Sequence, residues 1–344
     1  MTRAAVLTAP RRLELEAIEL DPPGSGQVSV SVMACGICAS NLNLWQRGPR
    51  TGDLAAGASG HEIAATVEAL GPGVSGFAPG DLVCVEPNLA TACGACPECR
   101  SGHALRCQHP TRLPTWGFAD RMIVRAAGAM KVPAHLQPER VTLVEPLACA
   151  VHALRRSEAI GPDLQLTRPA RIAIIGAGAL GLLTAFTARR LGAENVAIVP
   201  RYPHQAALAK RVGATELLAS EALADFRPDL VVIAAGGSGP QLSTAVDAVS
   251  PGGEIVVLGM LTAPQPFNLR RAGFREVRIT FAMSYSGPSA RSDFAVAIQL
   301  LAERGELTSL ITHRLPLTSI QQAFAVAADR QAGAVRVVVQ PPAG

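Results

Sequence analysis

The stretch "ARIAIIGAGALGLLTAFTARRLGAENVAIVPR", residues 170–201, has the pattern of a strand, a glycine turn, a helix and a second strand. Its apolar, β-branched run Ile172–Ile175 predicts a fully buried strand of a parallel sheet. The run leads directly into Gly176, Gly178 and Gly181, which have G-x-G-x-x-G spacing. A helix is expected through "LGLLTAFTARRLGA", and "NVAIV" returns as the next strand. The pattern therefore predicts an α/β domain with a doubly wound parallel sheet.

The glycine turn predicts a dinucleotide-binding site. Glycines permit a tight turn and a close backbone approach, so a pyrophosphate can lie against the free amides at the helix N-terminus. Ala179 and Leu180 stand between the second and third glycines and complete the candidate cofactor loop. Because this motif lies inside a complete strand, helix, strand unit, it is more specific than an isolated G-x-G-x-x-G.

The end of the second strand favours NADP(H) over NAD(H). An acidic residue at this place accepts hydrogen bonds from the adenosine ribose, whereas an arginine accommodates a 2′-phosphate. Here the strand ends "IVPRYPHQ", with Arg201, Tyr202 and His204 and no carboxylate. A guanidinium can bind a phosphate through two hydrogen bonds. The alternative is that Arg201 is a solvated surface residue and that either cofactor binds.

Length and composition limit the remaining possibilities. A chain of 344 residues, 49% of them hydrophobic, predicts two domains with substantial cores. No apolar run approaches the roughly 18 residues of a membrane span, and the N-terminus lacks the apolar block of a signal peptide. The formal net charge of +4 comes from scattered arginines without interleaved aromatics. We therefore expect a cytoplasmic protein that binds neither nucleic acid nor membrane.

Four of the eight cysteines lie in "CGACPECRSGHALRC", residues 93–107. They are Cys93, Cys96, Cys99 and Cys107. In a reducing cytoplasm such a cluster favours metal ligands over disulfides, and C-x-x-C steps in tight turns suit a closed tetrahedral zinc site. A closed site leaves no position for a substrate, so this zinc is expected to be structural. An iron–sulfur cluster, a redox centre and inert buried cysteines remain the alternatives.

A second set of possible ligands lies on either side of this stretch. It consists of Cys38 in "ACGICASN", His61 and Glu62 in "SGHEIAA", and Glu145 in "VEPLACAVHAL". Dispersed ligands of mixed type are typical of a catalytic zinc, which has three protein ligands and one exchangeable position. Each motif is weak by itself, since a lone Cys or His is more often structural. Their joint occurrence carries the prediction.

From end to end the chain resembles the zinc-dependent medium-chain alcohol and polyol dehydrogenases. The marks are "CGICASNLNLW", "GHEIAATVEALGPGVSGFAPGDLV", the four-cysteine stretch, "EPLACAVHAL", the glycine loop, "PGGEIVVLGM" and "PLTSIQQAFAVAADRQAGAVRVVV". The resemblance implies a catalytic domain like a GroES-type β-barrel, formed by residues 1–147 and 284–344 with a zinc lobe at about 90–110. It implies a Rossmann domain over residues 148–283.

The resemblance also assigns roles to individual residues. Cys38 and His61 match the family's catalytic zinc ligands, and Glu145 stands where polyol-type members have a carboxylate. Glu62 matches a nearby carboxylate that can bind the metal or release it. Ser40 matches the hydroxyl that exchanges a proton with the substrate. Which of the two carboxylates is the third direct ligand stays open at this point.

Two positions depart from the family pattern, which has Asp in place of Asn41 and often His in place of Asn43. In the family the Asp is expected to accept a hydrogen bond from the zinc-bound His. Asn41 can accept that bond through its carbonyl oxygen but carries no charge. This predicts weaker metal affinity or a shifted pH profile. The change at Asn43 shortens any proton relay from Ser40.

The implied activity is hydride transfer between a nicotinamide cofactor and a secondary alcohol or its ketone. Two zincs per chain and a homodimer or homotetramer follow from the resemblance. The carboxylate ligand favours a polyol, sugar, cyclitol or amino alcohol, while the loop at residues 46–59 is expected to shape the pocket. The alternatives are a zinc-free enoyl or quinone reductase of the same superfamily and a catalytically silent zinc- and nucleotide-binding protein.

Overall fold

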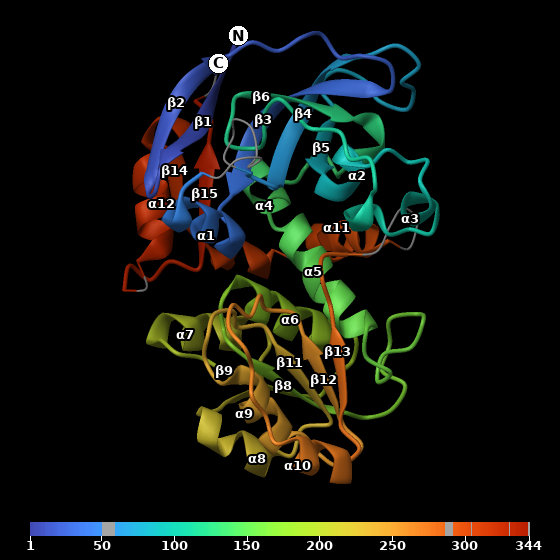
Figure 1. Ribbon diagram of the computed structural model, residues 1–344, viewed down its shortest axis with the longest axis vertical. Helices are drawn as coiled ribbons and strands as arrows, with labels where there is room; N and C mark the ends of the chain where they lie inside the picture. Colours follow the sequence, from blue (N-terminus) through green and yellow to red (C-terminus); the bar gives the residue numbers. More distant parts are fainter. Residues whose placement is uncertain (50–58, 286–291, 304, 330, 343–344) are drawn as a thin grey trace. The chain divides into compact units, whose positions relative to one another are not determined.

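The chain divides into two compact units, unit 1 (Met1–Glu145 and Ser286–Gly344) and unit 2 (Pro146–Tyr285). Figure 1 shows both in a computed structural model, in which blue and red segments from the two ends of the chain share unit 1. The structure describes residues 1–49, 59–285, 292–303, 305–329 and 331–342. The domain boundaries expected from the resemblance are near residues 147 and 284. In the structure they fall after Glu145 and after Tyr285.

Unit 2 contains a six-stranded parallel sheet in the order β10-β9-β8-β11-β12-β13. Its strands are β8 (Arg171–Ile175), β9 (Asn195–Val199), β10 (Glu216–Leu217), β11 (Leu230–Ile233), β12 (Glu254–Val257) and β13 (Arg278–Phe281). Successive strands run from β8 to one edge and from β11 to the other, so the strand order reverses between these two. In such sheets ligands bind beyond the carboxyl ends of the strands at the reversal. The predicted doubly wound sheet is confirmed.

Helices connect these strands. They are α6 (Ala179–Arg190), α7 (Pro203–Arg211), α8 (Leu223–Phe226), α9 (Gln241–Ala248) and α10 (Leu269–Phe274), with the short turn η3 (Ser220–Ala222). Most of α6 is buried all round, from Gly181 to Ala188, because its sequence has no polar face there. Gly192 lies in the turn between α6 and β9, and its φ of 94° lies in the left-handed region that glycine tolerates.

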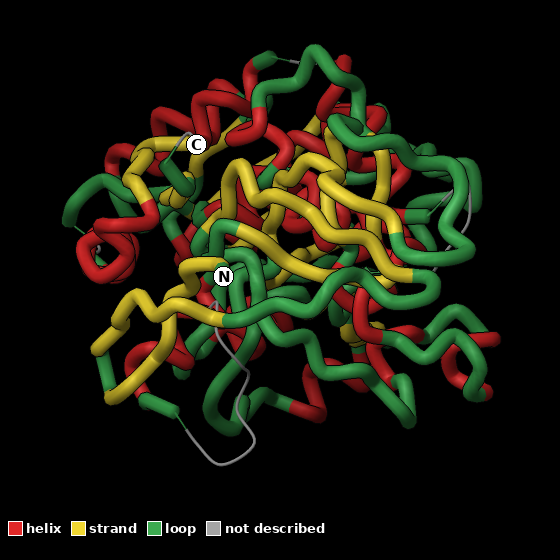
Figure 2. Tube along the Cα trace, turned by 90° about the horizontal axis from the view of Figure 1, so that it is seen from above, coloured by secondary structure: helices red, strands yellow, loops and turns green. Residues whose placement is uncertain are grey.

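The described strand pairs of unit 1 are antiparallel, except that the last two strands of the chain pair in parallel. A two-stranded sheet pairs β1 (Thr2–Ala9) with β2 (Arg12–Ile18). A seven-stranded sheet has the order β14-β15-β3-β4-β5-β7, with β6 also paired to β3. Its strands are β3 (Gln27–Gly36), β4 (Glu62–Leu70), β5 (Leu82–Val85), β6 (Arg121–Arg125), β7 (Ala129–Lys131), β14 (Ile311–Pro316) and β15 (Arg336–Gln340). In Figure 2 the strands are yellow, and those of this sheet run side by side.

The ten-residue strand β3 connects the two ends of the chain. One of its edges pairs with β4 along nearly its whole length. The opposite edge is divided, since residues Gln27–Ser31 pair with β6 while Cys35 and Gly36 pair with β15. The carboxyl end of β3 therefore lies between β4 and a strand from the far end of the sequence.

Helices of unit 1 cover this sheet and fill its ends. They are α1 (Ala39–Arg47), α2 (Pro87–Thr91), α3 (Pro97–Arg100), α4 (Pro138–Val141), α11 (Asp293–Glu303) and α12 (Ile320–Ala328), with η1 (Ala104–Arg106), η2 (Ala126–Gly128), η4 (Glu306–Leu310) and η5 (Leu317–Ser319). Helix α5 (Val144–Arg155) contains the boundary between the units. In the core, Phe118 packs edge-on against Phe324 with ring centroids 5.3 Å apart. Within the described part of the chain, no helix has the length and apolarity needed to cross a membrane.

Candidate functional site

The register of β3 and β4 brings three of the predicted metal ligands together. Cys38 is the residue before α1, two positions beyond the end of β3, and Glu62 pairs with Gly36 at the start of β4. His61 directly precedes Glu62. One ligand atom from each of Cys38, His61 and Glu62 lies within 4.8 Å of the other two. A thiolate, an imidazole and a carboxylate at this spacing match the ligand types that zinc accepts in catalytic sites.

Arg336 is a fourth member of this cluster that the sequence analysis did not single out. It begins β15, is only 3% exposed and forms an ion pair with the fully buried Glu62. A side chain at Gly36 would collide with the Glu62 carboxylate and lie 3.1 Å from the Arg336 guanidinium, so glycine is required for this approach. The available signal was a single arginine heading an apolar strand, "RVVV".

The charges in the cluster act strongly on one another. Burial opposes ionisation of Cys38, but the hydrogen bond and charge of His61 and the charge of Arg336 outweigh it and lower the pKa of Cys38. Burial likewise opposes protonation of His61, while Cys38 and the charge of Glu145 raise its pKa. Burial lowers the pKa of Arg336 to about 10, against the charges of Cys38 and Cys35. Cys38 and His61 thus each favour the charged form of the other.

Of the two remaining predicted catalytic residues, Ser40 lies next to Cys38, whereas Glu145 lies outside the group of three ligand atoms. A side-chain hydrogen bond between Ser40 and Cys38 contributes to the lowered pKa of Cys38, so the Ser40 hydroxyl lies beside the sulfur. Glu145, in the first turn of α5, is 9% exposed and is not among the three residues whose ligand atoms lie within 4.8 Å. Its charge nevertheless acts on His61. Of the loop expected to shape the pocket, residues 50–58 lie outside the described part of the chain.

The hydrogen bonds around His61 differ from those expected from the sequence. His61 Nδ1 lies 2.8 Å from the carbonyl oxygen of Ser59, which therefore accepts its proton. Asn41, expected to be this acceptor, instead accepts a 2.9 Å hydrogen bond from the Cys38 backbone N–H. Its Nδ2 donates to the carbonyl and hydroxyl oxygens of Ser59 at 3.0 and 3.1 Å. A backbone carbonyl two residues away has taken the place of a side-chain acceptor.

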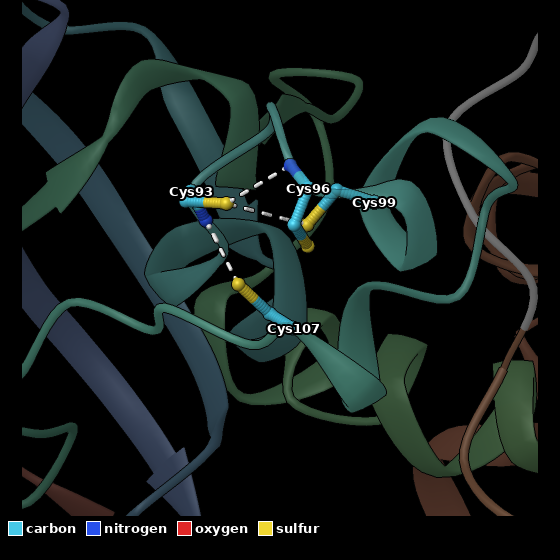
Figure 3. A group of neighbouring side chains, drawn as sticks. All are labelled: Cys93, Cys96, Cys99 and Cys107. Atoms are coloured by element: carbon cyan, nitrogen blue, oxygen red, sulfur yellow. Dashed lines mark hydrogen bonds between the residues drawn. The ribbon is translucent and has the colours of Figure 1, made fainter.

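Figure 3 shows the second predicted metal site, where Cys93, Cys96, Cys99 and Cys107 converge around α3. Their four sulfur atoms lie within 4.8 Å of one another. The backbone nitrogens of Ala95 and Cys96 each lie 3.4 Å from the Cys93 sulfur. The backbone nitrogen of Cys93 lies 3.2 Å from the Cys107 sulfur. Backbone donors therefore point at the sulfurs, as expected for a C-x-x-C turn.

The surroundings of these thiols favour ionisation of some and oppose that of another. Hydrogen bonds from the Ala95 and Cys96 backbone lower the pKa of Cys93, and backbone hydrogen bonds also lower the pKa of Cys96. Desolvation and then the neighbouring Cys96 raise the pKa of Cys99. A divalent cation would remove this conflict, and four converging thiolates are the ligand set of a structural zinc.

The glycines of unit 2 form the tight turn predicted for a cofactor loop. Gly176 has a φ of 103°, and a side chain there would lie 2.8 Å from Ala235. Gly178 precedes α6 and has open space around it, which leaves room for a ligand to approach the backbone. A side chain at Gly181 would collide with the carbonyl oxygen of Gly176. Each of the three positions therefore has its own steric reason for being glycine.

Arg201, Tyr202 and His204 form a small group after β9. The Tyr202 and His204 rings are stacked with centroids 5.6 Å apart and planes 9° apart. The exposed Arg201 guanidinium lies 5.8 Å from the Tyr202 ring centroid, while the Arg201 N–H donates to Gln205. Among the described residues no carboxylate is paired with Arg201, so its guanidinium is available to an anion.

Known proteins resemble this chain over nearly its whole length. A family model for the alcohol dehydrogenase GroES-like domain matches residues 24–134, and one for zinc-binding dehydrogenase matches residues 179–303. Sorbitol dehydrogenase of Pongo abelii is 29% identical over 346 residues, covering 93% of this chain and 90% of the relative. L-threonine 3-dehydrogenase of Saccharopolyspora erythraea is 28% identical over 348 residues, with 97% and 98% covered. A solved structure from Sinorhizobium meliloti 1021, described as a zinc-binding dehydrogenase bound to NADP, has 26% identity and a TM-score of 0.84, with 99% of each chain covered.

Proposed function

Since the chain belongs to the zinc-dependent medium-chain dehydrogenase family, we propose that it interconverts a secondary alcohol and its ketone by hydride transfer with a nicotinamide cofactor. The observation that carries the proposal is the convergence of Cys38, His61 and Glu62 within 4.8 Å, beside the Ser40 hydroxyl. A zinc-free reductase of the same superfamily does not need this combination. The Ser40 hydroxyl beside the ligands favours turnover over a catalytically silent zinc- and nucleotide-binding protein.

The residues have distinct parts in the proposed reaction. A zinc ion held here would polarise the substrate oxygen and favour loss of its proton near neutral pH. Cys38 and His61 would hold the metal with a carboxylate from Glu62 or Glu145. Ser40 would take the alcohol proton during oxidation and return it during reduction. Arg336 balances the charge of Glu62, which keeps a centre with several anionic groups stable while it is buried.

We further propose that the protein holds two zincs per chain and prefers NADP(H). The second zinc would be bound by the four cysteines of α3 and its flanks, and would support the fold without taking part in the reaction. NADP(H) is favoured because Arg201, with no carboxylate partner in the described structure, follows β9 where a 2′-phosphate would lie. The NADP-bound relative supports this choice.

The proposed substrate is a small hydroxylated molecule such as a polyol, sugar, cyclitol or amino alcohol. Support comes from the names of the relatives, which include sorbitol, L-threonine and L-arabinitol dehydrogenases. We also propose a homodimer or homotetramer, to be checked by light scattering. A reducing compartment, the cytoplasm, suits a site that needs four reduced thiols.

The test combines metal content, cofactor binding and turnover of protein purified without chelator. Two zincs per chain, tighter binding of NADPH than of NADH, and NADP⁺ reduction with a polyol are expected. A single zinc that is retained in a Cys38→Ser variant would contradict a metal at the Cys38 cluster. Two zincs with cofactor binding but no turnover across polyols, cyclitols and ketones would indicate the silent binding protein instead.

A further inference from the structure

We propose that Asn41 is a positioning residue whose amide, by accepting on one side and donating on the other, joins the two segments that carry Cys38 and His61. This inference rests on the proposed function only in assuming that a metal binds Cys38 and His61. The family pattern has a carboxylate at this place, and the hydrogen bonds in this chain require an amide.

The orientation of the Asn41 side chain is fixed by its neighbours. The Cys38 backbone N–H can only donate, so the atom 2.9 Å from it must be the amide oxygen. The Ser59 carbonyl can only accept, so the atom 3.0 Å from it must be the amide nitrogen. The opposite assignment would place donor against donor and acceptor against acceptor. Asn41 is 1% exposed, so water does not replace these bonds.

Ser59 passes this constraint on to His61. Its carbonyl oxygen accepts from Asn41 Nδ2 and from His61 Nδ1 at 2.8 Å, which uses both of its lone pairs. With the proton held on Nδ1, the neutral ring has its Nε2 lone pair free for a metal. Ser59 itself has a φ of 55°, an uncommon conformation for a residue with a side chain. The Asn41 bonds help to hold it there.

A carboxylate at position 41 cannot make the same hydrogen bonds. It accepts hydrogen bonds but donates none, so one of its oxygens would face the Ser59 carbonyl oxygen at about hydrogen-bond distance. It would also add a buried charge close to Cys38, whose backbone N–H bonds to this side chain. Asn41→Asp, which restores the usual family residue, should therefore loosen the His61 segment. This is the opposite of the effect expected from the sequence, because that expectation had residue 41 accept the His61 proton, which the Ser59 carbonyl accepts instead.

The experiment compares zinc retention under a competing chelator in the wild-type protein, Asn41→Asp and a matched control. Asn43→Asp is that control, because Asn43 lies on the same helix α1 but is exposed. Asn41→Asp is expected to lower the zinc affinity of the Cys38 site about tenfold to a hundredfold, a loss typical when a partner that orients a ligand is removed. Asn43→Asp should stay near wild type.

A spectroscopic readout separates positioning from general destabilisation. In cadmium-substituted protein, a four-thiolate site and a one-thiolate site give separate NMR resonances because cadmium shielding follows the number of sulfur ligands. Asn41→Asp should shift or broaden the one-thiolate resonance and leave the four-thiolate resonance unchanged. Unchanged zinc affinity and an unchanged one-thiolate resonance in Asn41→Asp would overturn the proposal.

The proposed function and this inference fail in different ways. Absence of a one-thiolate resonance in the wild-type protein would remove the metal at Cys38 and with it the proposed function. The role of Asn41 is then decided by urea unfolding with chelator present. There Asn41→Asp should unfold at a clearly lower urea concentration than Asn43→Asp. Equal midpoints would overturn the role of Asn41 as well.

Discussion

The variant Arg336→Met should show how much the buried ion pair with Glu62 contributes to the stability of unit 1. Glu62 is fully buried and Arg336 is 3% exposed, so the pair is largely shielded from water. Methionine keeps a long apolar side chain but removes the charge and leaves a buried carboxylate without its cation. Breaking a buried pair in this way costs about 3–5 kcal/mol, which we expect as the loss in unfolding free energy of unit 1.

The chain provides a fluorescence probe for unit 1 alone. Its two tryptophans, Trp45 and Trp116, are both buried and both belong to unit 1, so their emission follows the unfolding of that unit in urea. Arg336→Met should lower the urea midpoint of unit 1. The loss in unfolding free energy should shrink as the pH falls, because a protonated carboxyl group costs less to bury. Added zinc should stabilise this variant more than the wild type.

A double-mutant cycle tests the electrostatic explanation. Glu62→Gln combined with Arg336→Met removes both charges, and the double variant should lose much less than the sum of the two single losses. Additive losses, or a loss below about 1 kcal/mol for Arg336→Met, would mean that the pair behaves like an exposed salt bridge. The account of a charge-balanced cluster would then be wrong.

Three further predictions concern other parts of the molecule. Burial raises the pKa of Glu86 from 4.5 to about 7, so its protonated form favours the fold and its stabilising contribution is lost as the pH rises through this range. The unfolding free energy of Glu86→Gln relative to that of the wild type should therefore rise by up to about 3 kcal/mol between an acidic and an alkaline urea titration. A difference that does not change with pH would contradict this. Gly181→Ala should abolish nicotinamide fluorescence enhancement while leaving the zinc content unchanged, because its side chain would strike the Gly176 carbonyl. Arg201→Ser should weaken NADPH binding roughly tenfold or more and leave NADH binding unchanged, whereas equal losses in titrations of the two cofactors would refute phosphate recognition.

Local patterns in the sequence were enough to predict the parts of the fold that depend on neighbours in the chain. The strand, glycine turn and helix of residues 171–190 follow from β-branched residues and G-x-G-x-x-G spacing, and the structure has β8 and α6 there. The convergence of Cys93, Cys96, Cys99 and Cys107 likewise follows from short spacing, since tight turns leave few other arrangements. Periodicity and turn chemistry act over a few residues, which is why these predictions succeed.

The cluster of Cys38, His61 and Glu62 was only partly predictable, because its contacts depend on strand register. The ligand types at Cys38, His61 and Glu62 are visible in the sequence, but nothing there indicates that β15 pairs with the end of β3 and brings Arg336 to Glu62. The acceptor for His61 was also missed. It is a backbone carbonyl, and every residue carries one, so residue identity gives no signal for it.

The division of unit 1 into two segments has a consequence for how the protein is made. Unit 2 is an unbroken stretch of chain and can fold on the ribosome as soon as it emerges, as domains generally do. Cys38, His61 and Glu62 emerge well before it, whereas Arg336 follows it. A chain truncated after Tyr285 should therefore have a complete unit 2 but an incomplete Cys38 cluster, whose thiol is open to oxidants and to competing metals.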